Sequence, residues 1–315
     1  MTNGTRCEIE ALSRALIVLA VMAPVAPAVC AQASTPYEQI NAEAATSAIS
    51  VHPVRGNISV LEGSGGDITV LSGAEGLLMV DAGIAVSASK LETALQGIER
   101  GPIKYLINTH WHWDHTDGNG WVHRAGATII AHENTAKHLR ETIRVSEWGH
   151  TFTPLAAGDR PTRLVGRSQD LSFGGETLRM RYYGPAHTDG DLSVYFANAD
   201  VLATGDTWWN GLYPFIDYVA GGSIDGMINA MTANISMSGD RTIVIPGHGP
   251  VGNKTELVEF RDMLVEIRGR VAELKKAGKT VDEAIAAAPT APYDSKYGQG
   301  VIKPALFVTL VYRGV

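Results

Sequence analysis

The stretch THWHWDHTDGNG, residues 109–120, concentrates side chains that can bind metal ions. His110, His112, Asp114 and His115 fall close together within it. Imidazole and carboxylate groups are common ligands of zinc, and two neighbouring ions need more ligands than one short segment can supply. Unpaired histidines and carboxylates crowded into a purely structural turn would be wasteful. The spacing therefore predicts one part of a metal site.

Three further candidate ligands lie beside glycines at the ends of strand-like runs. His187 lies in GPAHTDGD, Asp206 in ATGD and His248 in PGHG. Taken singly, each is more simply explained as a capping, turn or core residue. The run IKYLINT before His110 is also strand-like, and a sheet can present the ends of several strands at one edge. Together these segments predict a single site built from strand ends.

Hydrophobic periodicity predicts the elements that must position these residues. The first half reads as short strands followed by an alternation of strands and helices, and the second half repeats this style after an irregular stretch at 149–166, which could form a flap. Two mixed sheets with helices on their outer faces are the simplest packing of that order. The expected helices are 87–99, 133–143, 224–237, 253–278 and 280–288.

The N-terminus has the pattern of an export signal. Arg6 and Arg14 precede an apolar run at 15–23, and the small residues at 31–33 resemble a cleavage site. The run is short for a membrane span, so a retained anchor is the weaker alternative. We therefore expect an exported, periplasmic protein.

Both cysteines, Cys7 and Cys30, fall within this segment, so a chain cleaved after it would have no disulfide and no thiolate ligand. The expected organisation has four parts, which are an export signal at 1–33, an extension at 34–56, a catalytic domain at 57–252 and a C-terminal segment of helix and strand packed on that domain at 253–315.

Charge and length limit the classes of partner. With 315 residues and 45% hydrophobic content, the chain can bury a sizeable core. The formal net charge of −7, without clustered Lys and Arg, argues against a nucleic-acid surface. We expect an uncharged or cationic small-molecule substrate, no nucleic acid, and no membrane partner once the signal is removed. No oligomeric state follows from the sequence.

The motifs over about residues 57–249 resemble those of the metallo-β-lactamase fold superfamily. Members of this superfamily are hydrolases that fold as a four-layer αββα sandwich. The resemblance implies a first metal held by three histidines, a second metal held by one aspartate and two histidines, and one aspartate that bridges both. The first metal would be held by His110, His112 and His187, and the second by Asp114, His115 and His248. The bridging aspartate would be Asp206.

The resemblance also assigns supporting roles. Asp81, in VDAG, would support the loop that carries the ligands, while Asp117 matches no ligand position and is expected in a turn. Two zinc ions are the expected cofactors, with iron or manganese possible at one position. Asp114 would orient the attacking hydroxide and move its proton.

The expected reaction is attack by metal-bound hydroxide on a carbonyl bond, in a β-lactam amide, a lactone or an ester. A phosphodiesterase and a glyoxalase II-like thioesterase are the alternatives, with an iron redox module and a catalytically silent metal-binding protein as rivals of another class. Near Asp206 an aromatic loop at 207–218 suggests an apolar wall for the substrate, although packing beneath a long loop accounts for it equally well. Its candidate contacts are Trp208, Trp209 and Tyr213.

Overall fold

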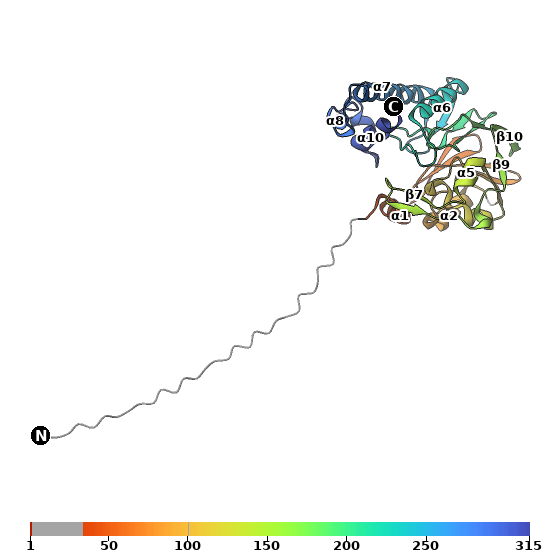
Figure 1. Cartoon of the computed structure of the whole chain (residues 1–315). Helices are drawn as coiled ribbons and strands as arrows, with labels where there is room; N and C mark the ends of the chain where they lie inside the picture. The colour runs from red at the N-terminus through yellow and green to blue at the C-terminus, as the bar shows by residue number, and fades with distance from the viewer. Residues whose placement is uncertain (2–33, 100) are drawn as a thin grey trace. The chain divides into compact units, whose positions relative to one another are not determined.

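The computed structural model describes Met1, residues 34–99 and residues 101–315 (Figure 1). The predicted export signal at 1–33 lies outside the described residues, apart from Met1. Within the part of the chain that is described, no helix combines the length and the apolar character needed to cross a membrane.

The first sheet has seven strands in the order β1-β2-β3-β4-β5-β6-β9. Neighbours from β1 to β4 are antiparallel, whereas β4, β5, β6 and β9 run parallel to one another. Its strands are β1 (Ser50–Arg55), β2 (Ile58–Glu62), β3 (Ile68–Gly73), β4 (Gly76–Val80), β5 (Ile103–Ile107), β6 (Thr128–His132) and β9 (Arg163–Val165).

The second sheet has six strands in the order β10-β11-β12-β13-β14-β15, and only the β13–β14 pair is parallel. A separate hairpin joins β7 (Ile143–Val145) to β8 (His150–Phe152). The strands of the second sheet are β10 (Ser168–Phe173), β11 (Glu176–Tyr182), β12 (Leu192–Phe196), β13 (Val201–Ala203), β14 (Ile243–Ile245) and β15 (Gly252–Asn253).

Helices cover the outer faces of both sheets, with α6 and α7 over one and α2 over the other (Figure 1). The main helices are α1 (Pro36–Thr46), α2 (Ala88–Ile98), α6 (Ile224–Met237), α7 (Lys254–Lys276) and α10 (Pro304–Gly314). Shorter ones are α3 (Trp113–Thr116), α4 (Asn119–Arg124), α5 (Glu133–His138), α8 (Val281–Ala286) and α9 (Asp294–Tyr297), with 3-10 turns η1 (Ala85–Ser87), η2 (Ala157–Asp159) and η3 (Gly205–Thr207).

Strand β4 shows why four layers form. Its residues are all buried, but they alternate between two hydrophobic clusters. Leu78 and Val80 pack between the two sheets, whereas Leu77 and Met79 pack beneath the outer helices, because successive side chains of a strand point to opposite faces. The predicted αββα sandwich is confirmed.

Local departures from the predicted elements come from tertiary pairing. The helix expected over 133–143 ends at His138, because Ile143 and Val145 pair with β8 and are buried there. The stretch expected to be irregular at 149–166 contributes β9 to the first sheet.

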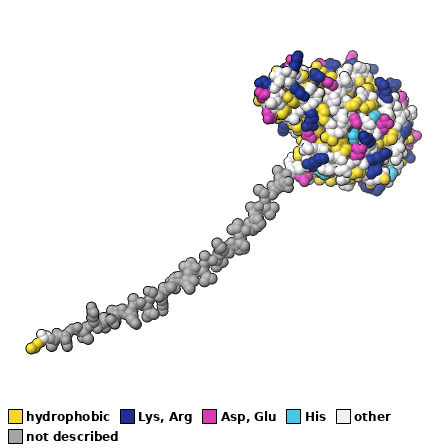
Figure 2. Space-filling model, viewed as in Figure 1, with side chains coloured by type: hydrophobic (Ala, Val, Ile, Leu, Met, Phe, Trp, Pro, Cys, Tyr) yellow, Lys and Arg dark blue, Asp and Glu magenta, His cyan; other side chains and the backbone are white. Residues whose placement is uncertain are grey.

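The strand expected within 253–315 is absent from the described residues beyond Asn253, which are helix or loop. The apolar run near the C-terminus forms α10 instead, because Phe307, Val308 and Val311 share one buried helix face. On the face drawn in Figure 2, basic and acidic side chains are interspersed.

Candidate metal centre

Seven histidine and aspartate side chains converge where the strands of both sheets end. The segment from His110 to His115 follows β5, and Asp206 and His248 follow the parallel strands β13 and β14. His187 follows β11, which runs in the same direction as β13 because β12 is antiparallel to both. The carboxyl ends of these strands therefore meet at one edge, which is where such sheets usually bind ligands.

Four of the histidines are each held by a hydrogen bond at one ring nitrogen. Nδ1 of His110 lies 3.0 Å from Thr109 Oγ1, and Nδ1 of His187 lies 2.8 Å from the carbonyl oxygen of Phe215. In both of these rings the other nitrogen is directed into the cluster. The same arrangement is found in a second pair of rings. In that pair, His112 Nε2 lies 2.9 Å from Asp217 Oδ2 and His115 Nδ1 lies 2.8 Å from Asp81 Oδ2.

The inner nitrogens are arranged as ligands of a cation. Nδ1 of His112 and Nε2 of His187 lie 2.9 Å apart. Each ring uses its other nitrogen to donate, to the carboxylate of Asp217 and to a carbonyl respectively, so two neutral rings would face each other with lone pairs. Nε2 of His110, also buried, has no hydrogen-bond partner within the described part of the chain. The donor set therefore fits a metal ion.

The other candidate ligands form a second group beside the first. His248 Nε2 lies 3.3 Å from Asp114 Oδ2, and His115 Nε2 lies 3.6 Å from the same oxygen. The ligand atoms within each group lie within 4.8 Å of one another. The two groups that could hold a metal are His110, His112, His187 and Asp206, and Asp114, His115 and His248.

The carboxylate of Asp206 lies between the two groups. Its Oδ2 atom is 3.4 Å from His187 Nε2 and 3.4 Å from His248 Nε2, while its Oδ1 atom is 3.0 Å from His115 Nε2. The sequence resemblance implied a bridging aspartate at this position, and the structure places its two oxygens where each group can reach them.

Burial and charge divide the histidines into two kinds. Burial lowers the pKa of His187 to about 4 and holds the pKa of His110 well below its usual value. Burial acts in the same direction on His248 and His115, but there neighbouring carboxylates, Asp206 foremost, outweigh it. They raise the pKa of His248 to about 10 and the pKa of His115 well above its usual value. His110 and His187 are thus already neutral, the form that binds metal.

Asp81 holds the ligand loop in place. Its carboxylate accepts hydrogen bonds from the backbone nitrogen and the hydroxyl of Thr109, both at 2.7 Å, in addition to its contact with His115. Asp81 itself has a left-handed backbone (φ 67°), which turns the chain directly after β4. Asp117, expected in a turn, accepts a hydrogen bond from the backbone nitrogen of Ala85 at 3.0 Å.

Two glycines allow the backbone to approach the ligands closely. A Cβ atom at Gly66 would overlap the imidazole ring of His115, and one at Gly247 would overlap the carboxylate of Asp206. Neither neighbour can move away, because both are buried and held by the contacts described above. Any side chain at these positions would therefore displace a candidate ligand.

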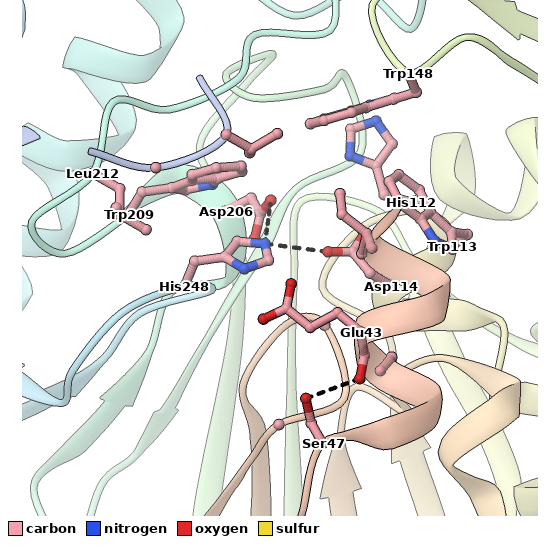
Figure 3. Close-up of a pocket in the computed structure, with 16 residues that line it drawn as sticks. Glu43, Ser47, His112, Trp113, Asp114, Trp148, Asp206, Trp209, Leu212 and His248 are labelled. Carbon is pink, nitrogen blue, oxygen red and sulfur yellow. Dashed lines mark hydrogen bonds and ion pairs between the residues drawn. The ribbon is translucent and has the colours of Figure 1, made fainter. Parts of the chain in front are cut away.

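A cavity of about 390 Å³ opens onto Asp114 and His248 of the second group, onto His112 of the first group, and onto the bridging carboxylate of Asp206. Asp114, Asp206 and His248 line it together with Trp209 and Trp148, and Figure 3 shows them around one space. Helix α1 contributes Glu43 and Ser47 to the facing side, and residues 300–301 complete the wall. A small organic substrate can thus reach the candidate metal ligands.

The structure separates the three aromatic residues expected to contact substrate. Trp209 lines the cavity, but Trp208 and Tyr213 are 0% and 1% exposed and lie in the core. These two side chains are therefore too buried to contact a substrate in the cavity. The rings of Tyr213 and Phe307 are stacked, with their centroids 4.6 Å apart. Trp208 has an extended backbone, and adjacent side chains of an extended segment point in opposite directions.

Sequence reasoning missed residues that the structure brings to the site. Asp217 anchors His112, and its Oδ1 also accepts from the backbone nitrogens of Val219 and Ala220. Glu43 and Trp148 line the cavity from segments that carry no ligand motif. The available signal for Asp217 was an aspartate near the end of the aromatic loop and shortly before two glycines, a pattern that also describes many ordinary turns.

The comparisons with known proteins agree with this geometry at the level of class. The fold and the two ligand groups are those of a metallo-hydrolase. The chain belongs to the Metallo-beta-lactamase superfamily, whose family model matches residues 61–252. This confirms the resemblance and bears out the prediction of a metal-dependent hydrolase.

Individual relatives are more distant. A 2,4-dinitroanisole O-demethylase subunit alpha from Nocardioides sp. (strain JS1661) is 28% identical over 52% of this chain, which spans about half of that relative, 47%. A metallo-beta-lactamase type 2 from Bacillus sp. (strain 170) is 25% identical over 74% of this chain and 89% of its own length.

A solved structure extends the similarity in fold. The sec-alkylsulfatase Pisa1 from Pseudomonas sp. matches with a TM-score of 0.66 at 16% identity, over 88% of this chain and 52% of its own. An alignment of that length must include part of the helices after residue 253.

Proposed function

We propose that the protein is a binuclear zinc hydrolase that cleaves a carbonyl bond, with an uncharged or cationic ester or lactone as the favoured substrate class. The observation that carries this proposal is the position of Asp206, whose two oxygens lie 3.4 Å from His187 Nε2 and 3.0 Å from His115 Nε2. One carboxylate within reach of both ligand groups suits a pair of cations that act on one bond.

Bound zinc would lower the pKa of a coordinated water towards about 7 and polarise the substrate carbonyl. The remaining contributions come from the chain. Asp114 borders the cavity with its Oδ2 atom 3.3 Å from His248 Nε2, where its carboxylate would orient the attacking water and hold its proton. Trp209 would position the apolar part of the substrate.

The charge of the cavity wall supports an ester or lactone without negative charge over the other candidates. Its lining, taken over the described residues, contains no Lys or Arg, and it contains the carboxylate of Glu43. β-Lactam antibiotics, phosphodiesters and glutathione thioesters all carry negative charge, which a basic side chain would normally bind. The relative named as a metallo-beta-lactamase keeps the β-lactam amide as the second candidate.

Metal analysis followed by a substrate panel tests the proposal. Purified protein without residues 1–33 should contain two equivalents of zinc by mass spectrometry, although iron or manganese at one position would also be compatible with the ligand set. The panel should include a p-nitrophenyl ester, a lactone, nitrocefin, a thioester and bis(p-nitrophenyl) phosphate. Ester or lactone turnover is expected to exceed the rest. Turnover of the phosphodiester alone, or of no compound by zinc-loaded protein, would contradict the proposal.

Export to the periplasm is part of the same proposal and is supported by the signal-like pattern at 1–33. Expression of the whole chain in a Gram-negative host should yield a periplasmic product that begins near Ser34. A chain with Arg6 and Arg14 both replaced by Glu should remain in the cytoplasm, and equal periplasmic recovery of both would contradict export.

A further inference from the structure

The cavity has an acidic residue on the side that faces the candidate ligands. Glu43 lies on α1, and Figure 3 shows its side chain directed into the space between His248 and Asp114 on one side and Ser47 on the other. Its backbone carbonyl accepts hydrogen bonds from Ser47, which hold the last turn of the helix. Within the described residues, no Lys, Arg or His side chain lies within ion-pair distance of the Glu43 carboxylate.

A basic side chain that contacts the same helix is already engaged by backbone carbonyl groups. Lys90 donates hydrogen bonds to the carbonyl oxygens of Ala44 and Ser47, at 2.6 and 2.5 Å, and so binds the C-terminal end of α1. Lys90 does not line the cavity. The carboxylate of Glu43 is therefore available to a molecule that enters.

Three indole rings surround the same space. Trp113, Trp148 and Trp209 line the cavity and are almost fully buried, so their orientation is fixed by packing. The rings of Trp113 and Trp148 lie 5.5 Å apart at 67° to each other, and Trp209 lies 4.3 Å from the ring of His248. Indole has the most electron-rich face among the aromatic side chains, and it attracts cations such as quaternary ammonium groups.

From this juxtaposition of an unpaired carboxylate and three indole rings we infer that the preferred substrate is an ester or lactone that carries a cationic ammonium group. Glu43 is exposed to solvent, so a neutral apolar substrate that covered it would remove its charge from water without supplying a partner, which is unfavourable. An anionic substrate would be repelled. An ammonium group bound between Glu43 and the indole rings would satisfy the carboxylate while the carbonyl lies at the ligand groups. The inference rests on the proposed function for the bond that is cleaved.

A pair of isosteric esters tests the inference. Butyrylcholine and 3,3-dimethylbutyl butyrate have the same shape, but only the first is charged. With zinc-loaded protein, we expect KM to be about tenfold lower for butyrylcholine, a difference of about 1.4 kcal/mol, with similar kcat. The variant Glu43→Gln should bring the ratio of the two kcat/KM values close to one, whereas Glu92→Gln, which removes an exposed carboxylate on α2, should leave the ratio unchanged. Equal kcat/KM values for the two esters in the unsubstituted protein would overturn the inference.

A binding measurement separates this inference from the proposed function. Tetramethylammonium should quench the tryptophan fluorescence of zinc-loaded protein, and Glu43→Gln should weaken its binding about fivefold, within the range expected for a partly exposed ion pair. Binding of tetramethylammonium without hydrolysis of either ester would support the cation site and contradict the ester hydrolase. Hydrolysis of both esters without binding of tetramethylammonium would support the ester hydrolase and contradict the cation site. Hydrolysis of both esters with equal tetramethylammonium binding by Glu43→Gln and the unsubstituted protein would lead to the same conclusion.

Discussion

The two ligand groups share Asp206 but differ in their enclosure. The side chains of His110, His112 and His187 are at most 2% exposed, whereas in the second group Asp114 and His248 are 10% and 17% exposed and only His115 is fully buried. The first group is the more enclosed, since only His112 among its histidines borders the cavity, and it is anchored through its outer nitrogens. In the second group, Asp114 and His248 form part of the cavity wall. The enclosed group is thus suited to retain a metal, and the open group to exchange one and meet the substrate.

Removal of metal should produce the largest effect and reveal this difference directly. A chelator added to zinc-loaded protein should abolish hydrolysis, and zinc should be released in two phases, because the open group is more accessible to the chelator than the enclosed group. A chromogenic chelator would follow both phases while ester turnover is measured in parallel. Release in one phase would contradict the difference between the groups.

Substitution of one histidine from each group should separate the two further. His110→Ala should lower kcat/KM by more than about 100-fold, because it removes an enclosed ligand that no other side chain can replace. This loss is larger than the effect expected when a residue that only anchors a ligand is substituted. His248→Ala should lower activity similarly but retain one tightly held zinc equivalent. Metal content by mass spectrometry and ester kinetics would check both. Full metal and activity in His110→Ala would show the ligand assignment to be wrong.

Weaker effects are expected from the carboxylates that anchor the histidines. Asp217→Asn should reduce zinc affinity at the enclosed group, and Asp81→Asn should reduce it mainly at the open group, each by about 10–100-fold, with a smaller effect of Asp81→Asn on the enclosed group through Thr109 and His110. The physical reason is loss of the charged acceptor that fixes the ring of His112 or of His115. Competition with a chelator of known affinity should show each variant shifting a different binding step, and a shift of the same step by both would count against independent groups.

The smallest effect should come from a buried histidine outside both groups. Nδ1 of His132 accepts a hydrogen bond from the backbone nitrogen of Asn134 at 3.2 Å and so caps α5, which requires a neutral ring. Burial lowers the pKa of His132 from its usual 6.5. As the pH falls below that value, the unfolded chain binds a proton more readily than the folded chain, so the free energy of unfolding should fall.

The variant His132→Asn provides a cap that does not titrate. It should change stability by about 1 kcal/mol or less at pH 8 and should remove part of the loss between pH 6.5 and pH 5. Urea unfolding at several pH values would measure this. Zinc content should stay the same, and a loss of zinc would place His132 within the metal site.

Local sequence patterns predicted the fold and predicted that the seven candidate ligands lie at one edge of the sheets. They could do so because strand formation and the placement of residues at strand ends depend on interactions over short distances in the sequence. Strand-like runs end where ligands are needed, and His110 to His115 form a denser cluster of ligand side chains than a structural turn requires. The side chains that anchor the ligands were harder to find. Asp217 reaches His112 from 105 positions away, and only the folded chain shows the contact.

The aromatic loop shows the same limit at finer scale. Trp208 and Trp209 are identical in type and adjacent in sequence, yet one fills the core and the other lines the cavity. Their opposite orientation depends on the extended backbone after η3 and on the bridge that pairs Trp209 with His248. Neither feature has a sequence pattern of its own. The same holds for Glu43, whose helix reaches the cavity only through tertiary packing.

The backbone at Gly66 and Gly247 sets a boundary on how this enzyme can be diversified. A saturation library selected for activity should tolerate almost no replacement at these two positions, although neither has a functional group, because any side chain would push His115 or Asp206 aside. Directed evolution of a new specificity would have to work on other lining residues, such as Leu212 and Val301, which border the cavity. Variation in substrate preference among natural relatives should be concentrated there as well.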